Sequence, residues 1–483
     1  TTMNDSIRGP LSNGPTPDML EVDAPPLHEF RLGDVARLIV VFFVIATSTL
    51  NALARRGLRI VGRTVSVKLG RTPSTEPVAG LIDAACNGLI DGFIRLGPTF
   101  VKLGQIIASS GALFPDQLVA AARRCLDQVP TFPAEVARAT IAEDLGHPIE
   151  SVFAAFVDEP LSAASIGQVH AVTLHDGREA VVKVQRPGIR EQMAGDLRNA
   201  ARVAWLFEKT PWGKASGAVA IIEDLHSVTF QELNPVREAW QQDRFRSNIW
   251  AFGDNTMITA PEVYWDFCGR RTICMERVSG MPMDRFDELA ERGLDLQLVV
   301  RRGAKVWAEA AMIHGPFHGD MHAGNIWVLD DGRGCFLDFG IMGELSGEWQ
   351  DLMKDLFYTC AIDLDFRRVV ESYRRVGAIP AEFSDDTQLS MFLTNVLGTM
   401  LADGFGGVDI GALVTESVKM LKTYNASVPR ELVLIAKQLL YIDRYTKHLA
   451  ADYSITSDPF IIKNVFPEEA AKKAADLGVA MPI

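Results

Sequence analysis

The chain of 483 residues is short of cysteine, and its cysteines form no motif. Six cysteines are present, but none belongs to a Cys-x-x-Cys pair or to a Cys/His cluster with the spacing of a zinc site. This pattern excludes a small disulfide-stabilised scaffold. It predicts reduced, mostly buried thiols in a cytosolic protein.

Basic residues are scarce relative to acidic ones, with 48 Lys and Arg against 61 Asp and Glu and a formal net charge of -13. Nucleic-acid affinity comes largely from clustered Lys and Arg that neutralise phosphates. We therefore expect no nucleic-acid partner. Hydrophobic residues make up 48% of the chain, which indicates a globular protein. At about 100–200 residues per domain, the length predicts about three structural units.

The N-terminal residues lack a hydrophobic pattern. Five prolines lie among Gly, Asn, Ser and Thr in residues 1–26. This composition favours a solvated segment over a packed element. We therefore predict a disordered tail over residues 1–33, with an extended strap as the alternative.

Acidic residues are absent from residues 35–75, which carry seven basic ones. Within this segment, residues 38–54 are 17 residues without a charge. As a helix they would be about 25 Å long, against a hydrocarbon core of roughly 30 Å, so spanning is marginal. We predict a helix that lies on or dips into a membrane, with the following arginines at anionic headgroups. The alternative is a buried helix that packs on the main domain.

The central region predicts a site for nucleotide phosphates. Two β-branched runs flank an Asp176-Gly177 turn, as in a tight hairpin. Small residues precede the first run, so the backbone there can approach a ligand closely. Lys183 lies among valines in the second run, where a charged amine needs a carboxylate or a phosphate. Taken singly, these features are typical of an ordinary turn and an edge-strand lysine. The predicted phosphate-binding residues are Ala163, Ala164, Ser165, Gly167, Gln168 and Lys183.

A second group of polar residues lies far downstream. His318-Gly-Asp320 is followed by Asn325, a predicted strand hairpin and Asp338-Phe-Gly. Kinase-type folds use this order to place a catalytic carboxylate beside two metal ligands. We predict that Asn325 and Asp338 hold Mg²⁺, which prefers oxygen ligands and shares them with phosphates. Asp320 is then available to orient or deprotonate a nucleophile. Two ordinary hairpins, the alternative, would not explain why loop, lysine and acidic residues occur in this order.

Two further predictions concern the region between these groups. Residues 271–278 predict a strand that leads into the junction of two lobes, where Met275, Glu276 and Val278 would meet adenine. Glu238, in a predicted helix over residues 231–246, is the candidate partner of Lys183. The alternative for Glu238 is a solvated helix glutamate.

Over roughly residues 86–453, the sequence resembles the UbiB/AarF/ADCK family of atypical kinase-like proteins. Residues 96–105 match the family's Lys-x-Gly-Gln signature. An alanine-rich loop, residues 163–168, replaces the glycine-rich loop of protein kinases. Glu232-Leu-Asn234 stands at the place of the family's Glu-x-Asp motif.

The resemblance gives the signature helix a role that its residues alone leave open. Lys102 and Gln105 share one face of a predicted apolar helix. Taken alone, this pattern is more typical of a polar stripe exposed to solvent than of a functional site. The resemblance implies that this helix folds over the active site, with Lys102 and Gln105 reaching toward the nucleotide and Glu232. The segment after Asp-Phe-Gly is also short, residues 341–347, and lacks Ala-Pro-Glu, so a platform for peptides is missing.

Three features depart from the family pattern. Asn234 replaces the second carboxylate of the gating motif. Glu344 stands where relatives commonly have a basic residue. The chain after Tyr453 lacks the hydrophobic pair of bacterial ubiquinone-pathway members, so we expect any membrane anchor to come from the N-terminal run.

We predict an α+β, atypical protein-kinase-like two-lobed fold with a family-specific N-terminal helical extension. The expected parts are a tail (1–33), a basic apolar membrane-associating segment (34–75), the helical extension (76–150), an N-lobe (151–283), a C-lobe (284–458) and a C-terminal tail (459–483).

The resemblance implies binding of ATP or ADP with Mg²⁺ and slow ATP hydrolysis that supports lipid or isoprenoid-quinone metabolism, without phosphorylation of proteins in trans. The alternatives are a small-molecule or lipid phosphotransferase and a nucleotide-gated, non-catalytic scaffold for a lipid-modifying complex. The expected partners are an anionic membrane surface on the cytoplasmic side, a lipid or isoprenoid-quinone precursor and lipid-modifying enzymes.

Overall fold

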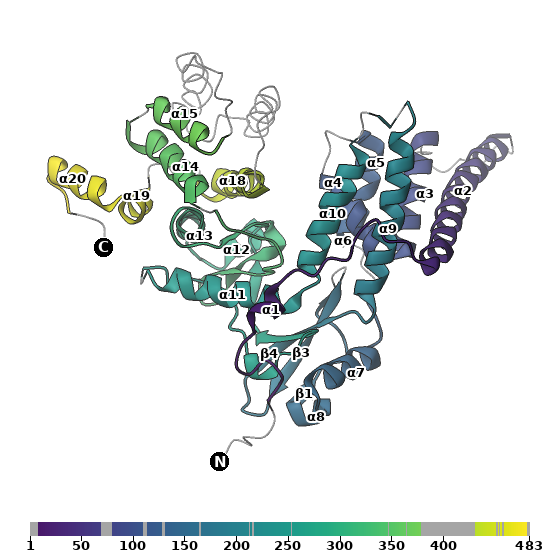
Figure 1. The fold of residues 1–483 in the computed structure, drawn as a ribbon, viewed down its shortest axis with the longest axis horizontal. Coiled ribbons are helices and arrows are strands. Elements are labelled where there is room, and N and C mark those ends of the chain that lie inside the picture. The colour runs from purple at the N-terminus through teal and green to yellow at the C-terminus, as the bar shows by residue number, and fades with distance from the viewer. Residues whose placement is uncertain are drawn as a thin grey trace. The chain divides into compact units, whose positions relative to one another are not determined.

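The computed structural model divides the chain into two compact units, residues 1–236 with 264–275, and residues 237–263 with 276–483. Their helices and some of their strands are labelled in Figure 1. The described residues are 8–68, 80–109, 114–127, 131–163, 166–211, 213–214, 217–252, 254–345, 347–363, 365–377, 430–450, 453, 455 and 458–480. Ala164 and Ser165 of the predicted phosphate loop lie outside them.

The N-terminal residues form an extended strap on the first unit. The Gly9 N–H donates to the Asp266 carbonyl at 2.7 Å, and Leu11 is 1% exposed. A Cβ on Gly9 would lie 2.8 Å from the Cys268 carbonyl oxygen, so this contact requires glycine. The short helix α1 (Pro17–Leu20) follows. From residue 8 onward the predicted disordered tail is wrong, because these contacts fix the strap.

Helix α2 (Leu32–Lys68) is 37 residues long and extends beyond the uncharged run at both ends. Arginines continue the helix because their long side chains reach solvent from its surface. Of the described residues, this one helix is long and apolar enough to cross a membrane, judged by length and composition alone. The helix is therefore longer than the uncharged run, for which we estimated about 25 Å.

The start of α2 is tied to helix α9 (Ile189–Glu208) by buried ion pairs. Arg198 donates to both carboxylate oxygens of Asp34, at 2.8 and 2.9 Å. Arg37 donates to both oxygens of Asp196, at 2.7 and 3.0 Å, and Thr99 donates to the same carboxylate at 3.0 Å. Asp196 thus joins α2 to α4 (Pro98–Ser109), the helix that carries Thr99.

Helix α3 (Leu81–Leu96) runs antiparallel to α2 at very close range. A Cβ on Gly88 would lie 2.6 Å from the Cα of Thr49, and one on Gly92 would lie 3.2 Å from the Cα of Ile45. Small residues four apart allow two helix backbones to approach in this way. One side of α2 therefore packs on the protein, as the buried-helix alternative expected, whereas Phe42 (68%) on another side is exposed.

Short helices complete the extension before the sheet. They are α5 (Asp116–Ala122), α6 (Arg124–Asp127), α7 (Ala134–Leu145) and α8 (Ile149–Val152). The five cysteines whose side chains the structure describes are free thiols, and four of them are buried, as the sequence predicts.

The sheet of the first unit has the strand order β1-β3-β4-β6, with β2 paired to β3. Its strands are β1 (Phe153–Phe156), β2 (Ser162–Ala163), β3 (Gly167–Leu174), β4 (Glu179–Gln185) and β6 (Thr272–Glu276). The predicted hairpin is present as β3 and β4, and Gly177 adopts the positive φ of 88° that its turn requires. Helix α10 (Ala218–Glu232) packs on α9.

The second unit is mainly helical around two small sheets. Its helices are α11 (Pro235–Trp250), α12 (Phe286–Glu291), α13 (Leu296–Glu309), α14 (Gly347–Tyr358), α15 (Phe366–Arg375), α18 (Arg430–Leu449), α19 (Pro459–Val465) and α20 (Pro467–Leu477). One sheet is β5 (Ile258–Thr259), β10 (Gly334–Phe336), β9 (Ile326–Leu329) and β7 (Gly280–Pro282), and the other pairs β11 (Met342–Gly343) with β8 (Phe317–His318).

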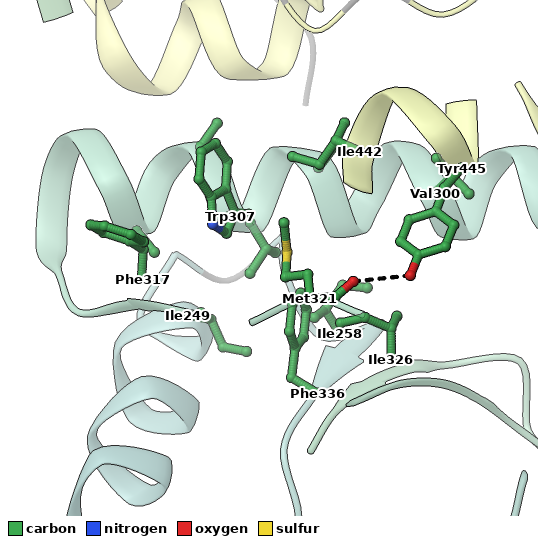
Figure 2. Close-up of a cluster of buried hydrophobic side chains, with 14 of the residues drawn as sticks. Ile249, Ile258, Val300, Trp307, Phe317, Met321, Ile326, Phe336, Ile442 and Tyr445 are labelled. Atoms are coloured by element: carbon green, nitrogen blue, oxygen red, sulfur yellow. Dashed lines mark hydrogen bonds between the residues drawn. The ribbon is translucent and has the colours of Figure 1, made fainter. Parts of the chain in front are cut away.

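The core of the second unit packs α13 and α18 against the strands that carry the acidic motifs (Figure 2). Trp307 and Phe317 meet edge to face with ring centroids 6.0 Å apart. The Tyr445 hydroxyl donates to the Met321 carbonyl at 2.9 Å (Figure 2).

The unit boundaries differ from the predicted ones. Residues 76–150 join the sheet of the first unit, and the units divide between Met275 and Glu276. This position lies within the stretch where we expected two lobes to join, but before the predicted boundary at Met283. Residues 237–263 belong to the second unit because α11 and β5 pack in its core. The predicted C-terminal tail contains α19 and α20.

Candidate active site

His318 joins the two acidic motifs of the second unit. Its Nε2 lies 3.0 Å from the Leu337 carbonyl and 2.9 Å from the Asp338 carbonyl, and its Nδ1 accepts from the Asp320 N–H at 3.2 Å. Complete burial lowers the pKa of His318, so the ring stays neutral with its proton on Nε2. One buried imidazole therefore fixes the loop of Asp320 against the start of Asp-Phe-Gly.

Asp320 is held by residues of α18 that the sequence did not indicate. Lys437 Nζ lies 2.7 Å from Asp320 Oδ1. Gln438 brackets the same loop, because its Nε2 donates to the Gly319 carbonyl at 2.6 Å and its Oε1 accepts from the Met321 N–H at 2.7 Å. A residue more than 100 positions away thus positions the candidate catalytic carboxylate.

The hairpin of β9 and β10 brings Asn325 and Asp338 to one end. The Leu337 N–H donates to the Asn325 carbonyl at 2.8 Å, next to Asp338. Asn325 Nδ2 donates to the Asp320 carbonyl at 3.0 Å, which directs the amide oxygen elsewhere. Asp338 has a φ of 56°, a conformation rare for residues other than glycine.

These donors fit Mg²⁺. An amide oxygen and a carboxylate are the hard ligands that Mg²⁺ prefers, and the remaining positions are normally filled by water and substrate phosphates. Among the described residues no group of three or more His, Cys, Asp or Glu could hold a metal. The pair Asn325 and Asp338 therefore suits an ion that arrives with phosphates, and does not suit a zinc-type site.

The segment after Asp-Phe-Gly is short and fixed. β11 pairs with β8, so Met342 lies opposite His318. Glu344 accepts two hydrogen bonds from Arg244 of α11, at 2.6 and 2.7 Å. This bidentate pair gives the acidic side chain a structural role, at a position where the resemblance implies a basic residue.

In the first unit, Lys183 lies on β4 opposite Val169 of β3. Gly167 is needed by the sheet, because a Cβ there would lie 2.5 Å from the Val184 carbonyl oxygen. Gln168 was predicted to belong to the loop that holds phosphates, and that role stays a prediction, while its side chain has other partners. That side chain is buried, accepts from the Phe132 N–H and donates to the Phe132 carbonyl, each at 3.1 Å.

Four residues were predicted to gate the active site: Lys102, Gln105, Glu232 and Asn234. Two of them form an ion pair, and the other two have different partners. Lys102 of α4 donates to the Glu232 carboxylate of α10, and both side chains are largely buried. Gln105 donates to the Cys125 carbonyl at 3.1 Å, on the neighbouring α6. Asn234 Nδ2 donates to the carbonyls of Met19 and Glu21 in the strap, at 2.8 and 3.3 Å.

Asn234 therefore has a structural use that an aspartate could not fill. An amide donates hydrogen bonds, whereas an ionised carboxylate only accepts them. It follows Glu232 in the break between α10 and α11, so the predicted single helix over residues 231–246 is wrong at Leu233 and Asn234.

Two predictions from the lobe junction stay predictions. Glu238 is buried on α11, in the second unit, whereas Lys183 belongs to the first. The Glu276 N–H donates to the Glu262 carbonyl at 2.8 Å, so that N–H is already used. The adenine contacts of Met275, Glu276 and Val278 are untested.

The family known as the ABC1 atypical kinase-like domain matches residues 124–373. The chain belongs to this family. An uncharacterized protein of Mycobacterium tuberculosis is 34% identical over 447 residues, which cover 91% of this chain and 89% of that protein. A probable protein kinase UbiB of Marinobacter nauticus is 32% identical over 379 residues, covering 76% of this chain and 68% of that protein.

A solved structure supports the fold of this ABC1 family member. The erythromycin complex of a Mycobacterium tuberculosis protein matches with a TM-score of 0.50 at 22% identity, covering 81% of this chain and 97% of that one. Together with the family match, this establishes the atypical kinase-like fold that the motif order predicts.

Proposed function

We propose that this ABC1 protein binds adenine nucleotide with Mg²⁺ and performs phosphoryl chemistry at the γ-phosphate, in support of membrane lipid or isoprenoid-quinone metabolism. The observation that carries this proposal is the set of bonds around His318, which joins the Asp320 loop to the backbone of Asp338. Kinase-type sites need a carboxylate and metal ligands at fixed positions, because most of their catalysis is positioning and electrostatics.

Each polar residue has a distinct role in this proposal. Lys183 and backbone groups around residues 162–168 hold the nucleotide phosphates. Asp320 orients a water or hydroxyl and accepts its proton, and Lys437 keeps that carboxylate in place. Bound Mg²⁺, held by Asn325 and Asp338, would neutralise charge on the phosphates.

ATP hydrolysis fits better than phosphorylation of proteins in trans. The buried pair of Lys102 and Glu232 holds the signature helix in place. The segment after Asp-Phe-Gly is pinned by Arg244 and Glu344 and leaves little chain for a docking platform. Transfer of labelled phosphate to casein or myelin basic protein would contradict this part of the proposal.

Membrane association through α2 is the proposed location of this activity, on the cytoplasmic side. The support is the exposed apolar side of α2 together with the arginines that follow residue 54. A lipid or isoprenoid-quinone precursor, and enzymes that modify it, are the proposed partners.

Thermal-shift titration with ATP and ADP, with and without Mg²⁺, tests nucleotide binding. Nucleotide at about 100 times its Kd should stabilise the protein by roughly 2.7 kcal/mol. Asp338→Asn should lose the additional stabilisation that Mg²⁺ gives, because one metal ligand loses its charge. The absence of any shift in the wild type would refute the proposal.

Two further measurements separate the alternatives. A rise in turnover with an added hydroxyl compound would indicate a small-molecule phosphotransferase. If Asp320→Asn binds nucleotide without hydrolysis and still restores the lipid and quinone profile of a deletion strain, the protein is a nucleotide-gated scaffold.

A further inference from the structure

A polar cavity of about 190 Å³ lies between α2, α3 and the start of α6 in the first unit. Its walls include Ser48, Asn51 and Arg55 of α2. These three positions follow helical spacing, so they face one side of the helix. Sites for drug-sized ligands begin at about 300 Å³, so this cavity suits a single small group.

The opposite walls of the cavity add charge. They include Asp91 and Arg95 of α3 and Arg124 of α6. Arg124 donates to Asp91 Oδ1 at 2.6 Å, and Arg95 donates to Ser48 Oγ at 3.1 Å. With Arg55, the described walls of the cavity carry three guanidinium groups and one carboxylate, an excess of two positive charges. Such a site favours an anion.

The type of anion follows from the chemistry of the walls. Guanidinium groups match the geometry of phosphate oxygens and bind them through paired hydrogen bonds. The Asn51 amide and the Ser48 hydroxyl can donate further bonds to the same oxygens. A phosphate group therefore fits this cavity.

The position of the cavity along α2 identifies the source of the phosphate. Arg55 is the first charged residue after the uncharged run of residues 38–54, so the cavity lies where an apolar segment gives way to a basic one. Leu50 and Leu58, which are 63% and 72% exposed, lie along α2 on either side of this change. Exposed leucines beside a basic cavity match the boundary between acyl chains and headgroups.

We propose that this cavity binds the phosphate of an anionic phospholipid, with Arg55, Arg95 and Arg124 as its ligands. The inference rests on the membrane association proposed above and gives that association a specific site. Asp91 pairs with Arg124 and limits the affinity of the cavity for the anion.

The test measures flotation of the full chain with vesicles of phosphatidylcholine, with and without phosphatidylglycerol. Arg55→Gln with Arg95→Gln removes two charges from the cavity. The matched control is Arg59→Gln with Arg63→Gln, which removes two charges from α2 outside the cavity. The control should lose at most roughly 30-fold in binding, the general effect of two charges near an anionic surface. The cavity variant should lose roughly 10-fold more, because paired bonds to phosphate are lost as well.

Asp91→Asn gives a readout that a purely structural role would not produce. Removing this carboxylate frees Arg124 and should strengthen binding to anionic vesicles roughly 5-fold. Unchanged or weaker binding of Asp91→Asn would contradict the proposal. Unchanged stabilisation by nucleotide in all variants controls for folding of the protein.

The remaining outcomes separate this inference from the membrane proposal. If the wild type does not float with anionic vesicles, membrane association itself is wrong. If it floats and both double variants lose binding equally, only the cavity assignment is wrong. If glycerol phosphate in solution stabilises the wild type against unfolding but not the cavity variant, and the cavity variant floats as well as the control variant, the ligand is a soluble phosphate, and the lipid assignment is overturned.

Discussion

Lys437 Nζ lies 2.7 Å from Oδ1 of Asp320, the candidate catalytic carboxylate. The lysine comes from α18, and Gln438, the next residue, bonds the backbone on both sides of Asp320. Catalysis by positioned groups is sensitive to displacements of about 1 Å. A helix distant in sequence thus controls the position of the group that would accept the proton.

The first prediction concerns this contact. Lys437→Met should lower kcat for ATP hydrolysis by roughly 10-fold to 100-fold, because Asp320 loses its partner, while the nucleotide Kd changes little. Lys447→Met is the matched control, since Lys447 lies on the same helix and pairs with Asp443 instead. Steady-state kinetics and thermal-shift titration separate the two effects. A Lys437→Met enzyme with normal kcat would contradict the positioning role.

The second prediction concerns Lys102 and Glu232. Removing one member of a largely buried pair leaves the other charge buried, so Lys102→Met and Glu232→Gln should each destabilise the protein by about 3–5 kcal/mol. The combined Lys102→Met and Glu232→Leu variant should recover most of this loss. Unfolding in urea measures the free energy of each variant. Additive losses in the double variant would show that the two side chains act independently.

The third prediction concerns the strap. Asn234→Asp replaces a donor by an acceptor that faces the carbonyls of Met19 and Glu21. The change should lower the free energy of unfolding by about 1–3 kcal/mol and increase the rate of amide hydrogen exchange in residues 9–25. Asn87→Asp is the control, because Asn87 bonds only locally to Asp83 within α3. Equal exchange in wild type and Asn234→Asp would show that the strap does not depend on this amide.

The fourth prediction concerns pH. Burial lowers the pKa of His170, His226, His314 and His318, so these rings stay neutral in the folded protein. The unfolded chain binds protons below about pH 6.5, where the ordinary histidine titrates. Stability is therefore present above that pH and falls as the pH decreases, by at most about 1.4 kcal/mol per pH unit for each histidine.

Urea unfolding at several pH values between about 7.5 and 5 measures the slope of the free energy of unfolding against pH. His170→Gln should make the slope shallower, because His170 lies between Gln168 and the Val157 carbonyl in the sheet. A stability that rises on acidification would contradict the sign of this prediction.

The fifth prediction concerns the exposed side of α2. Phe42 and Phe43 are 68% and 60% exposed. Changing both to Asp should reduce binding to vesicles, including the part that persists at high salt, without loss of nucleotide binding. Leu477→Asp, at an exposed leucine of the second unit, is the control. Deleting residues 1–75 is a poorer test, because it would leave Arg198 buried without Asp34.

Local patterns were enough to predict the elements that carry the motifs. The β3–β4 hairpin depends on alternating apolar residues and the Asp176-Gly177 turn, both adjacent in sequence. The order of Asp320, Asn325 and Asp338 likewise lies within one short stretch, and it predicted the kinase-like fold. The family itself was indicated by residues 96–105, 163–168 and 232–234. The Lys102–Glu232 contact came from the resemblance and not from spacing.

Features that depend on tertiary contacts were not predictable. Nothing near Lys437 indicates that it meets Asp320, because helix periodicity carries no information about a distant loop. The sequence left open whether the N-terminal residues are disordered or form a strap for the same reason, since Gly9 is fixed by backbone groups around residue 267. The burial of the Gln168 side chain was not predictable either, because a small-residue loop and a sheet core have the same local composition.

The carboxylate of Asp196 is shared by Arg37 and Thr99, and this sharing gives the first unit a mechanical property. Arg37 lies near the start of α2, and Thr99 lies one turn before Lys102 on α4. A displacement of α2 therefore acts directly on the contacts that hold α4, the helix that carries Lys102. The position of α2 and the position of Lys102 are thus coupled through a single buried side chain, Asp196.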